Sequence, residues 1–306
     1  MQVLVTGGAG FIGSHTVEAL LASGASVRVL DNLSTGKEDN LPTHERLSLQ
    51  VGDIQSQSDV AEAMVGITHV LHLAAQVSVQ ASIENPPVSC SQNIQGFVNV
   101  ITAAKEQQVQ RFVYASSAAV YGIPQKLPVA EEDTLQPISP YGLEKCVNEQ
   151  YAQLLQELFK FNSLGLRYFN VYGPRQDPAS PYAGVISKFL EFIDNKQPLT
   201  VFGDGCQTRD FIYVKDIANA NVAALTKAAS GFCNVGTGNT WTLLEVIEVL
   251  SQCVRQTLAV EHLPPRDGDI VHSSARVEKI NELIGFSAKS DLSTGLKTLA
   301  QYCKVI

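Results

Sequence analysis

The sequence lacks the features that mark membrane, secreted and nucleic-acid-binding proteins. No apolar run approaches the ~20 residues of a membrane-spanning helix. No basic segment followed by an apolar stretch opens the chain, so we expect no signal peptide. Only 22 Lys and Arg stand against 30 Asp and Glu, and the resulting net charge of −8 argues against binding to a phosphate backbone. We therefore expect a cytoplasmic protein with no nucleic-acid or membrane partner.

The cysteines also lack a recognisable pattern. The six are scattered through the chain, with no CxxC pair and no histidine at ligand spacing: Cys90, Cys146, Cys206, Cys233, Cys253 and Cys303. Isolated cysteines in a reducing compartment usually pack as small hydrophobic side chains. We expect neither a metal site nor a disulfide.

The first half of the chain alternates short apolar runs with helical patterns. The 306 residues are 45% hydrophobic and 17% charged, enough for a large core in one or two domains. Strands are expected at Val3–Val5, Val27–Leu30, Leu47–Val51, Val70–Leu73 and Phe112–Tyr114, and helices at Ile12–Leu21 and Asn93–Ala104 among others. Uniformly apolar strands that alternate with helices predict a Rossmann-like, doubly wound parallel sheet of the α/β class.

The second half is richer in proline, glycine and short helices. Helical patterns cover Ile186–Asn195, Val214–Lys227, Leu243–Val254, Val277–Ile284 and Leu296–Cys303. We expect a Rossmann-like domain over residues 1–170 and a smaller C-terminal α/β substrate lobe over residues 171–306. No linker separates them, so the two should interleave around a shared cleft.

A glycine-rich turn joins the first strand to the first helix. Gly7, Gly10 and Gly13 have the spacing that lets a backbone approach a pyrophosphate at a helix N-terminus. Asp31 ends the second strand, where a carboxylate accepts hydrogen bonds from a ribose and repels a 2′-phosphate. Together they favour NAD over NADP, whereas either feature alone has a structural explanation.

A second group of residues suggests proton transfer. Tyr141 and Lys145 lie four residues apart, on one face of an expected helix. A nearby ammonium would lower the pKa of the phenol and make it a usable base. Ser116 and Ser117 follow the fifth strand, at the sheet edge where ligands bind. A lone Tyr-x-x-x-Lys is mostly structural, and the serines are what favour a catalytic role.

Taken together, these motifs and the later Tyr168–Arg175 segment resemble the extended short-chain dehydrogenase/reductase family, and within it the UDP-glucose/UDP-N-acetylglucosamine 4-epimerases. The resemblance covers essentially the whole chain. It implies Tyr141 as base and acid, Lys145 as its electrostatic partner and a ligand of the nicotinamide ribose, and Ser117 as a second hydroxyl donor. Besides the three glycines, Tyr141 and Lys145, it implies NAD contacts at Phe11, Ile12, Asp31, Asn32, Leu33, Ser34, Thr35, Gly36, Asp53, Ile54, Leu73, Ala74, Ala75, Gln76, Val77, Asn93 and Phe169.

The resemblance also implies a site for the sugar nucleotide. Besides Ser117 and Tyr141, it would be formed by Asn170, Thr200, Val201, Phe202, Arg209, Arg266, Asp269 and Ser273. Two arginines suit a diphosphate because of their charge and fork geometry. In the implied reaction the sugar is oxidised at C4, turns over in the pocket and is reduced on its other face, with NAD retained.

The resemblance also helps to choose among the reactions of the family. Its dehydratases carry an Asp-Glu pair directly after the hydroxyl residue, and its UDP-glucuronate decarboxylases carry a glutamate there. This chain has Ala118 and Ala119, which favours simple epimerisation. A bulky residue at the position of Ser273 excludes N-acetyl groups in the family, so we expect UDP-N-acetylglucosamine and UDP-N-acetylgalactosamine as substrates. UDP-glucose and UDP-galactose are further candidate substrates.

Other readings remain open at this point. The chain could be another nucleotide-sugar epimerase or reductase of the family, or a dinucleotide-binding protein without activity. The family commonly forms homodimers through two helices per subunit, here Pro87–Gln107 and Pro140–Phe161. Their outward faces would include Val100, Val147 and Leu154, although these side chains could equally belong to the core.

Overall fold

A seven-stranded parallel sheet forms the centre of the computed structural model, which describes residues 1–177, 184–265 and 270–306. The strand order is β11-β6-β5-β4-β1-β2-β3. The strands are β1 (Gln2–Thr6), β2 (Ser26–Asp31), β3 (Leu47–Val51), β4 (His69–His72), β5 (Arg111–Ser117), β6 (Ser163–Tyr168) and β11 (Gly231–Val235). The order reverses between β1 and β4, as in doubly wound sheets. The predicted fold class and all five predicted strands are confirmed.

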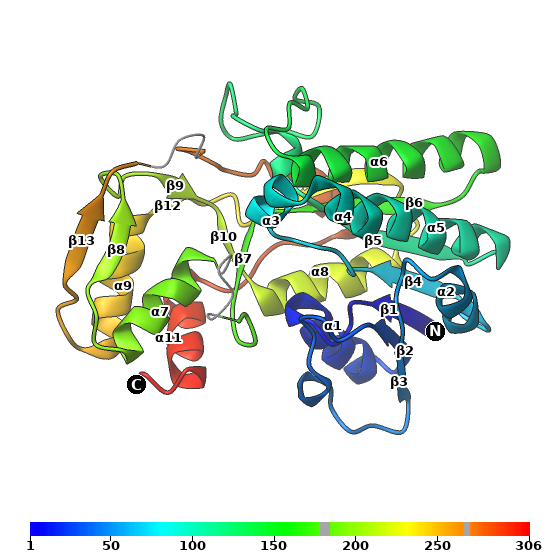
Figure 1. Ribbon diagram of the computed structural model, residues 1–306, viewed down its shortest axis with the longest axis horizontal. Helices are drawn as coiled ribbons and strands as arrows, with labels where there is room; N and C mark the ends of the chain where they lie inside the picture. Colours follow the sequence, from blue (N-terminus) through cyan, green and yellow to red (C-terminus); the bar gives the residue numbers. More distant parts are fainter. Residues whose placement is uncertain (178–183, 266–269) are drawn as a thin grey trace.

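Helices cover both faces of this sheet (Figure 1). One face carries α1 (Phe11–Ala22) and α8 (Val214–Thr226), which pack against each other. The other carries α2 (Gln57–Met64), α5 (Gly96–Glu106) and α6 (Pro140–Phe159). Three short helical segments precede α5: α3 (Val79–Glu84), α4 (Pro86–Cys90) and a π-helical turn η2 (Ser91–Gln95). The 3₁₀ turn η1 (Glu38–Asn40) lies between β2 and β3, and the 3₁₀ turn η3 (Ala118–Val120) follows β5. Buried apolar clusters on both faces form the core.

The helix α6 begins and ends at well-defined signals. Ser139 accepts a hydrogen bond from the Gly142 N–H, and Pro140 occupies the first turn, where its missing N–H costs nothing. Lys160 ends the helix in the left-handed conformation, at φ 56°. These signals fix the register of α6, and with it the positions of Tyr141 and Lys145 in the first two turns.

A smaller lobe lies beside one end of the sheet (Figure 1). Its strands form three two-stranded sheets: β7 (Asn170–Tyr172) with β10 (Phe211–Tyr213), β9 (Thr208–Arg209) with β12 (Trp241–Thr242), and β8 (Leu199–Phe202) with β13 (Val260–Leu263). Its helices are α7 (Val185–Asp194), α9 (Leu243–Val254) and α11 (Leu292–Tyr302), whereas α10 (Glu278–Ile284) packs against β11 of the large sheet. A separate apolar cluster forms its core.

The chain passes between the two parts more than once. The edge strand β11 and the helix α8 belong to the large sheet although both follow residue 170. The division at residue 170 therefore stays a prediction, and the interleaving of the two parts is a feature of the topology. Within the described residues, no helix has the length and apolar character needed to cross a bilayer.

Candidate active site

The turn after β1 leaves room for a ligand beside the backbone. Gly7 has φ +70°, and the Gly7 N–H donates to the Leu30 carbonyl at 2.9 Å, which ties the turn to β2. A Cβ atom at Gly13 would lie 2.1 Å from the Gly7 oxygen. Glycine is thus required for α1 to approach the turn, as a dinucleotide-binding loop needs.

The N-terminus of α1 points out of this turn. The first helical hydrogen bond runs from the Ser14 N–H to the Gly10 carbonyl at 3.0 Å, and no side chain caps the helix. The preceding N–H groups of Phe11 and Ile12 therefore have no partner within the helix. Unpaired N–H groups at a helix start attract anions, so this end of α1 suits a pyrophosphate.

Asp31 lies at the carboxyl end of β2, next to the same turn. The carboxylate is buried and accepts hydrogen bonds from the Ala9 and Leu33 N–H groups, each at 2.9 Å. Each oxygen has one further lone pair to offer. Asp31 therefore orders the loop and can still accept from a ribose hydroxyl, as NAD requires. Beyond it, Asn32 donates to Asp53 at 3.0 Å.

Burial raises the pKa of Asp53, but hydrogen bonds from Gln55 and Asn32 outweigh it and hold that pKa below its usual value. The carboxylate therefore stays ionised at neutral pH, beside the loop of residues 31–36. This placement is compatible with the predicted contact to the adenosine end of NAD.

The other predicted cofactor residues follow the carboxyl ends of β3, β4 and β6. The Ala74 N–H donates to Thr6, and the Gln76 N–H donates to Asn93 at 2.8 Å. Ile54 is buried, and its side chain packs so closely on Gly96 that a Cβ there would lie 2.5 Å from it. Only the Ile54 backbone is therefore available to a ligand. Phe169 is likewise buried in a small apolar cluster.

The structure brings Ser117, Tyr141 and Lys145 together. Ser117 ends β5, and α6 carries the other two. The Lys145 ammonium lies 5.7 Å from the centre of the Tyr141 ring and donates to the Ala115 carbonyl at 3.1 Å. The Ser117 oxygen accepts from the Ala119 N–H at 3.1 Å, which orients it at the same edge. This arrangement suits a tyrosine base that is assisted by a hydroxyl donor and a cation.

The surroundings of these groups perturb their protonation. Burial lowers the pKa of Lys145 to about 8, while the carboxylates of Glu144 and Glu149 raise it. Burial raises the pKa of Tyr141 above its usual value; the Ser117 hydroxyl lowers it and Glu144 raises it. The lowered phenol pKa that we expected from the sequence is therefore not produced by the chain alone. A bound cationic ring would have to supply part of the effect.

The substrate-lobe residues meet at one place. The Ser273 N–H donates to the Thr208 carbonyl at 3.1 Å, and Arg209 donates to the carbonyls of Thr208 and Val271, both at 3.0 Å. These hydrogen bonds hold β9 beside residues 271–273, so Arg209 and Ser273 lie close together. Arg266 and Asp269 lie outside the described residues.

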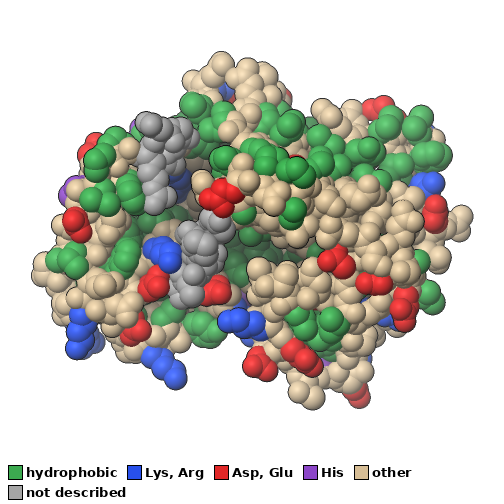
Figure 2. Space-filling view, in the orientation of Figure 1, with side chains coloured by type: hydrophobic (Ala, Val, Ile, Leu, Met, Phe, Trp, Pro, Cys, Tyr) green, Lys and Arg blue, Asp and Glu red, His purple; other side chains and the backbone are tan. Residues whose placement is uncertain are grey.

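The predicted uracil strand is β8. Val201 is fully buried in the core of the small lobe, so its side chain is unavailable to a ligand, whereas Thr200 and Phe202 are half-buried. Asn170 is exposed at the start of β7, where its N–H donates to the Asp210 carbonyl at 3.0 Å. Figure 2 shows the surface hollowed between the two parts of the molecule.

Sequence reasoning did not single out Asp210. Its buried carboxylate accepts hydrogen bonds from Thr237, Gly238 and Ala275, at 2.7–3.2 Å. Burial raises the pKa of this carboxyl, and these hydrogen bonds oppose the rise. Asp210, which directly follows Arg209, thereby holds the loop of Thr237 and Gly238 and the segment of Ala275 next to β9. The available signal was a carboxylate directly after a candidate binding residue.

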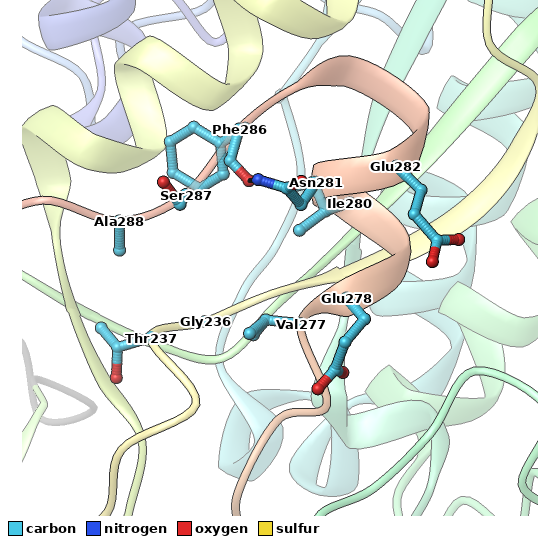
Figure 3. Close-up of a pocket in the computed structure, with 10 residues that line it drawn as sticks. All are labelled: Gly236, Thr237, Val277, Glu278, Ile280, Asn281, Glu282, Phe286, Ser287 and Ala288. Carbon is cyan, nitrogen blue, oxygen red and sulfur yellow. Dashed lines mark hydrogen bonds between the residues drawn. The ribbon is translucent and has the colours of Figure 1, made fainter.

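A separate cavity lies away from this site. It has a volume of about 370 Å³ and lies between the end of β11, helix α10 and residues 286–288 (Figure 3). Asn281 donates to the Phe286 carbonyl at 3.4 Å across its wall. Of the predicted site residues that the structure describes, none lines this cavity.

The described site has a parallel sheet with a helix start suited to an anion, a carboxylate able to accept from a ribose, and a Tyr-Lys-Ser cluster at its carboxyl edge. These features define an NAD-dependent enzyme of the Rossmann-like class. Residues 3–236 match the NAD dependent epimerase/dehydratase family. The chain belongs to this family, and NAD is its cofactor.

Relatives match the chain over nearly its full length. A putative UDP-glucose 4-epimerase of Methanocaldococcus jannaschii is 38% identical over 99% of this chain and 98% of its own. The UDP-N-acetylglucosamine 4-epimerase of Methanobrevibacter ruminantium, solved with UDP-N-acetylmuramic acid, is 37% identical with a TM-score of 0.95, over 98% and 97% of the two chains. The Thermus thermophilus UDP-glucose 4-epimerase, solved with NAD, is 37% identical with a TM-score of 0.92, over 99% of each chain.

Proposed function

We propose that the chain is a 4-epimerase of UDP-hexoses that interconverts UDP-N-acetylglucosamine with UDP-N-acetylgalactosamine and also UDP-glucose with UDP-galactose. The observation that carries this proposal is the cluster of Ser117, Tyr141 and Lys145 with two alanines directly after Ser117. Ala119 abuts the helix of the base, because a Cβ at Gly142 would lie 2.6 Å from the Ala119 oxygen. Ala118 and Ala119 carry no acidic or basic group, so these two positions supply no second acid or base for the elimination of water.

Each residue of the cluster has a defined part in the reaction. Tyr141 removes the proton from the sugar 4-hydroxyl and later returns it to the same oxygen, when C4 is reduced on its opposite face. Ser117 donates a hydrogen bond to the same oxygen, and the Lys145 ammonium stabilises the phenolate. NAD, when bound between the glycine turn and this cluster, supplies the acceptor and donor for the hydride at C4. No net oxidation results, so retained cofactor suffices for repeated turnover.

Proton NMR of the purified protein tests the function directly. UDP-N-acetylgalactosamine and UDP-galactose are supplied in separate tubes with no NAD added. Appearance of the gluco anomeric signal in both is the expected result and demonstrates epimerisation with retained cofactor. The absence of conversion in both tubes, even after NAD is supplied, would overturn the proposal in favour of another sugar nucleotide or of binding without turnover.

Ser273→Tyr is expected to narrow the substrate range. A phenol ring at this position would occupy the space proposed for the N-acetyl group, whereas a plain hexose lacks that group. We expect kcat/KM for UDP-N-acetylgalactosamine to fall about tenfold or more relative to that for UDP-galactose. Ser273→Ala, which adds no bulk, should leave the ratio unchanged. Equal losses on both substrates in Ser273→Tyr would contradict the assignment of Ser273.

We further propose a homodimer formed through α6 and the adjacent helices of residues 86–106. One face of α6 carries apolar side chains at helical spacing that the rest of the chain leaves partly or fully exposed: Leu143, Val147, Tyr151, Leu154 and Leu158. Figure 2 shows hydrophobic side chains gathered over this helix. Monomeric proteins rarely expose a continuous apolar stripe of this kind. Val100, in contrast, is fully buried and belongs to the core.

Leu154→Glu is expected to convert the dimer to a monomer. A charge in the middle of the stripe would have to be desolvated in the interface, which is unfavourable. Analytical ultracentrifugation should show about half the mass of the wild-type protein. Leu244→Glu places the same charge at an exposed leucine of the small lobe and should leave the mass unchanged. A wild-type monomer at micromolar concentration would refute the dimer.

A further inference from the structure

Glu144, the residue between Tyr141 and Lys145 that the proposed reaction does not use, is a buried carboxylate. Its Oε2 atom accepts a hydrogen bond from the Ser89 hydroxyl at 2.9 Å and another from the Asn93 amide at 2.6 Å. Both donors are neutral, and no ion pair joins Glu144 to another residue of the described chain. A buried carboxylate with no ion-pair contact is costly, and its retention needs an explanation.

The hydrogen bonds of Asn93 extend from Glu144 to the cofactor side. The Asn93 amide also donates to the Gln76 carbonyl at 2.8 Å, and its oxygen accepts from the Gln76 N–H at 2.8 Å. Gln76 belongs to the segment of residues 73–77 that follows β4. Glu144 therefore links the first turns of α6 to the loop proposed to contact NAD.

The backbone around Asn93 is itself unusual. Asn93 lies in the π-helical turn η2, and its carbonyl accepts from the Asn148 amide of α6 at 3.1 Å. A π-turn in an otherwise α-helical stretch often marks a functional position. Here α6 holds Asn93 at two points, through Glu144 at the side chain and through Asn148 at the backbone.

A second buried carboxylate near Lys145 provides an internal comparison. Glu149, one turn further along α6, forms a bidentate pair with Arg167 of β6, at 2.6 and 2.8 Å. The charge of Glu149 is thus largely neutralised by its partner. The charge of Glu144 has no such partner and acts on the groups around it at short range and in a low dielectric.

We propose that Glu144 is a positioning residue with two roles. It holds Asn93 and the loop of residues 73–77 against α6, and its buried negative charge sets the pH range in which Tyr141 and Lys145 work as a pair. This inference rests on the proposed roles of Tyr141 and Lys145.

The direction of the effect follows from the sign of the charge. Glu144 raises the pKa of both Tyr141 and Lys145. Without this charge the phenolate would form at lower pH, and the ammonium would also lose its proton at lower pH. Other groups that face the pair contribute less: His72 of β4 is neutral, with its pKa lowered to about 3 by burial, Ser117 is uncharged, and Glu149 is paired with Arg167.

Glu144→Gln separates the charge from the hydrogen bonds. The amide oxygen can take the position of Oε2 and accept from Ser89 and Asn93, while its NH₂ group takes the position of Oε1, to which no described residue donates. We expect both limbs of the pH profile of kcat/KM for UDP-galactose to move to lower pH by about one unit. Glu144→Ser, a smaller neutral variant, should move both limbs in the same direction, and Glu144→Asp should restore them.

Ser89→Ala is the matched control, because it removes a hydrogen bond to Glu144 and keeps the charge. Its limbs should remain in place. Three outcomes would each overturn the inference. The pH profile of Glu144→Gln could superimpose on that of the wild type, or Glu144→Gln could lose activity equally at every pH. The profile of Ser89→Ala could also shift as far as that of Glu144→Gln. Tyr141→Phe in the same assay separates a failure of the proposed function from a failure of this inference. If Tyr141→Phe stays active, the proposed base is wrong. If it is inactive and the limbs of the Glu144→Gln profile do not move, only the role of Glu144 is wrong.

Discussion

Tyr141→Phe is expected to lower kcat by about 10³-fold while the protein keeps its fold and its NAD. The phenylalanine ring can fill the same half-buried space beside Lys145, and only the hydroxyl that transfers the proton is lost. Positioned acid-base groups typically contribute between 10² and 10⁴ in rate. The loss should appear in kcat with little change in KM, because the contacts proposed for the UDP moiety lie in the other lobe.

The measurement compares turnover by NMR with the NAD content of the denatured protein. Tyr151→Phe is the matched control, since Tyr151 lies exposed on the same helix two turns beyond Lys145 and outside the site. It should retain full activity. More than about a tenth of wild-type activity in Tyr141→Phe would show that another group transfers the proton, and loss of bound NAD would show that the phenol serves binding instead.

The fold could be predicted where the sequence pattern is local and strong. The five strands of the first half are continuous apolar runs, because both faces of the sheet are covered by helices. The short pairs β7–β10 and β9–β12 have two or three residues per strand, too few for any periodicity to be visible. The position of β11 at the sheet edge depends on contacts between residues about 70 positions apart, so local patterns could not indicate it.

The candidate site shows the same division. The glycine turn, Asp31, and the spacing of Tyr141 and Lys145 are local motifs, and the structure places them along one edge of the sheet. The helix predicted over Asn93–Ala104 contains instead a π-turn at its start, where Asn148 of α6 donates to the Asn93 carbonyl. Such a tertiary contact leaves no trace in the local periodicity. The partners of Glu144 and Glu149 were not predictable for the same reason.

A buried ion pair anchors α6, the helix that carries the proposed base. Arg167 is fully buried in β6, and besides its two bonds to Glu149 it donates to the Tyr121 hydroxyl at 2.8 Å and the Glu131 carbonyl at 3.1 Å. Its guanidinium also lies 4.0 Å from the centre of the Phe232 ring. Ser116 donates to the same Glu149 carboxylate at 2.6 Å, so the network fastens α6 to the strand that ends in Ser117.

Arg167→Met is therefore expected to lower the free energy of unfolding by about 3–5 kcal/mol. Methionine fills much of the space, but the Glu149 carboxylate is left buried with Ser116 as its remaining donor. Such a loss is a large fraction of the 5–15 kcal/mol typical of folded domains. Urea unfolding followed by fluorescence or circular dichroism measures the change.

The double variant Arg167→Met, Glu149→Leu distinguishes a lost attraction from a stranded charge. If the cost of Arg167→Met comes from leaving Glu149 uncompensated, removing the carboxylate as well should restore most of the stability, since apolar replacements of a buried pair are often tolerated. If the double variant is instead less stable than Arg167→Met, the pair itself and its bonds to Tyr121 and Ser116 contribute the stability. In the first case, the main role of the network is to position α6 and the residues proposed for catalysis. The double variant should then have a much lower kcat than the wild type although its free energy of unfolding is nearly restored.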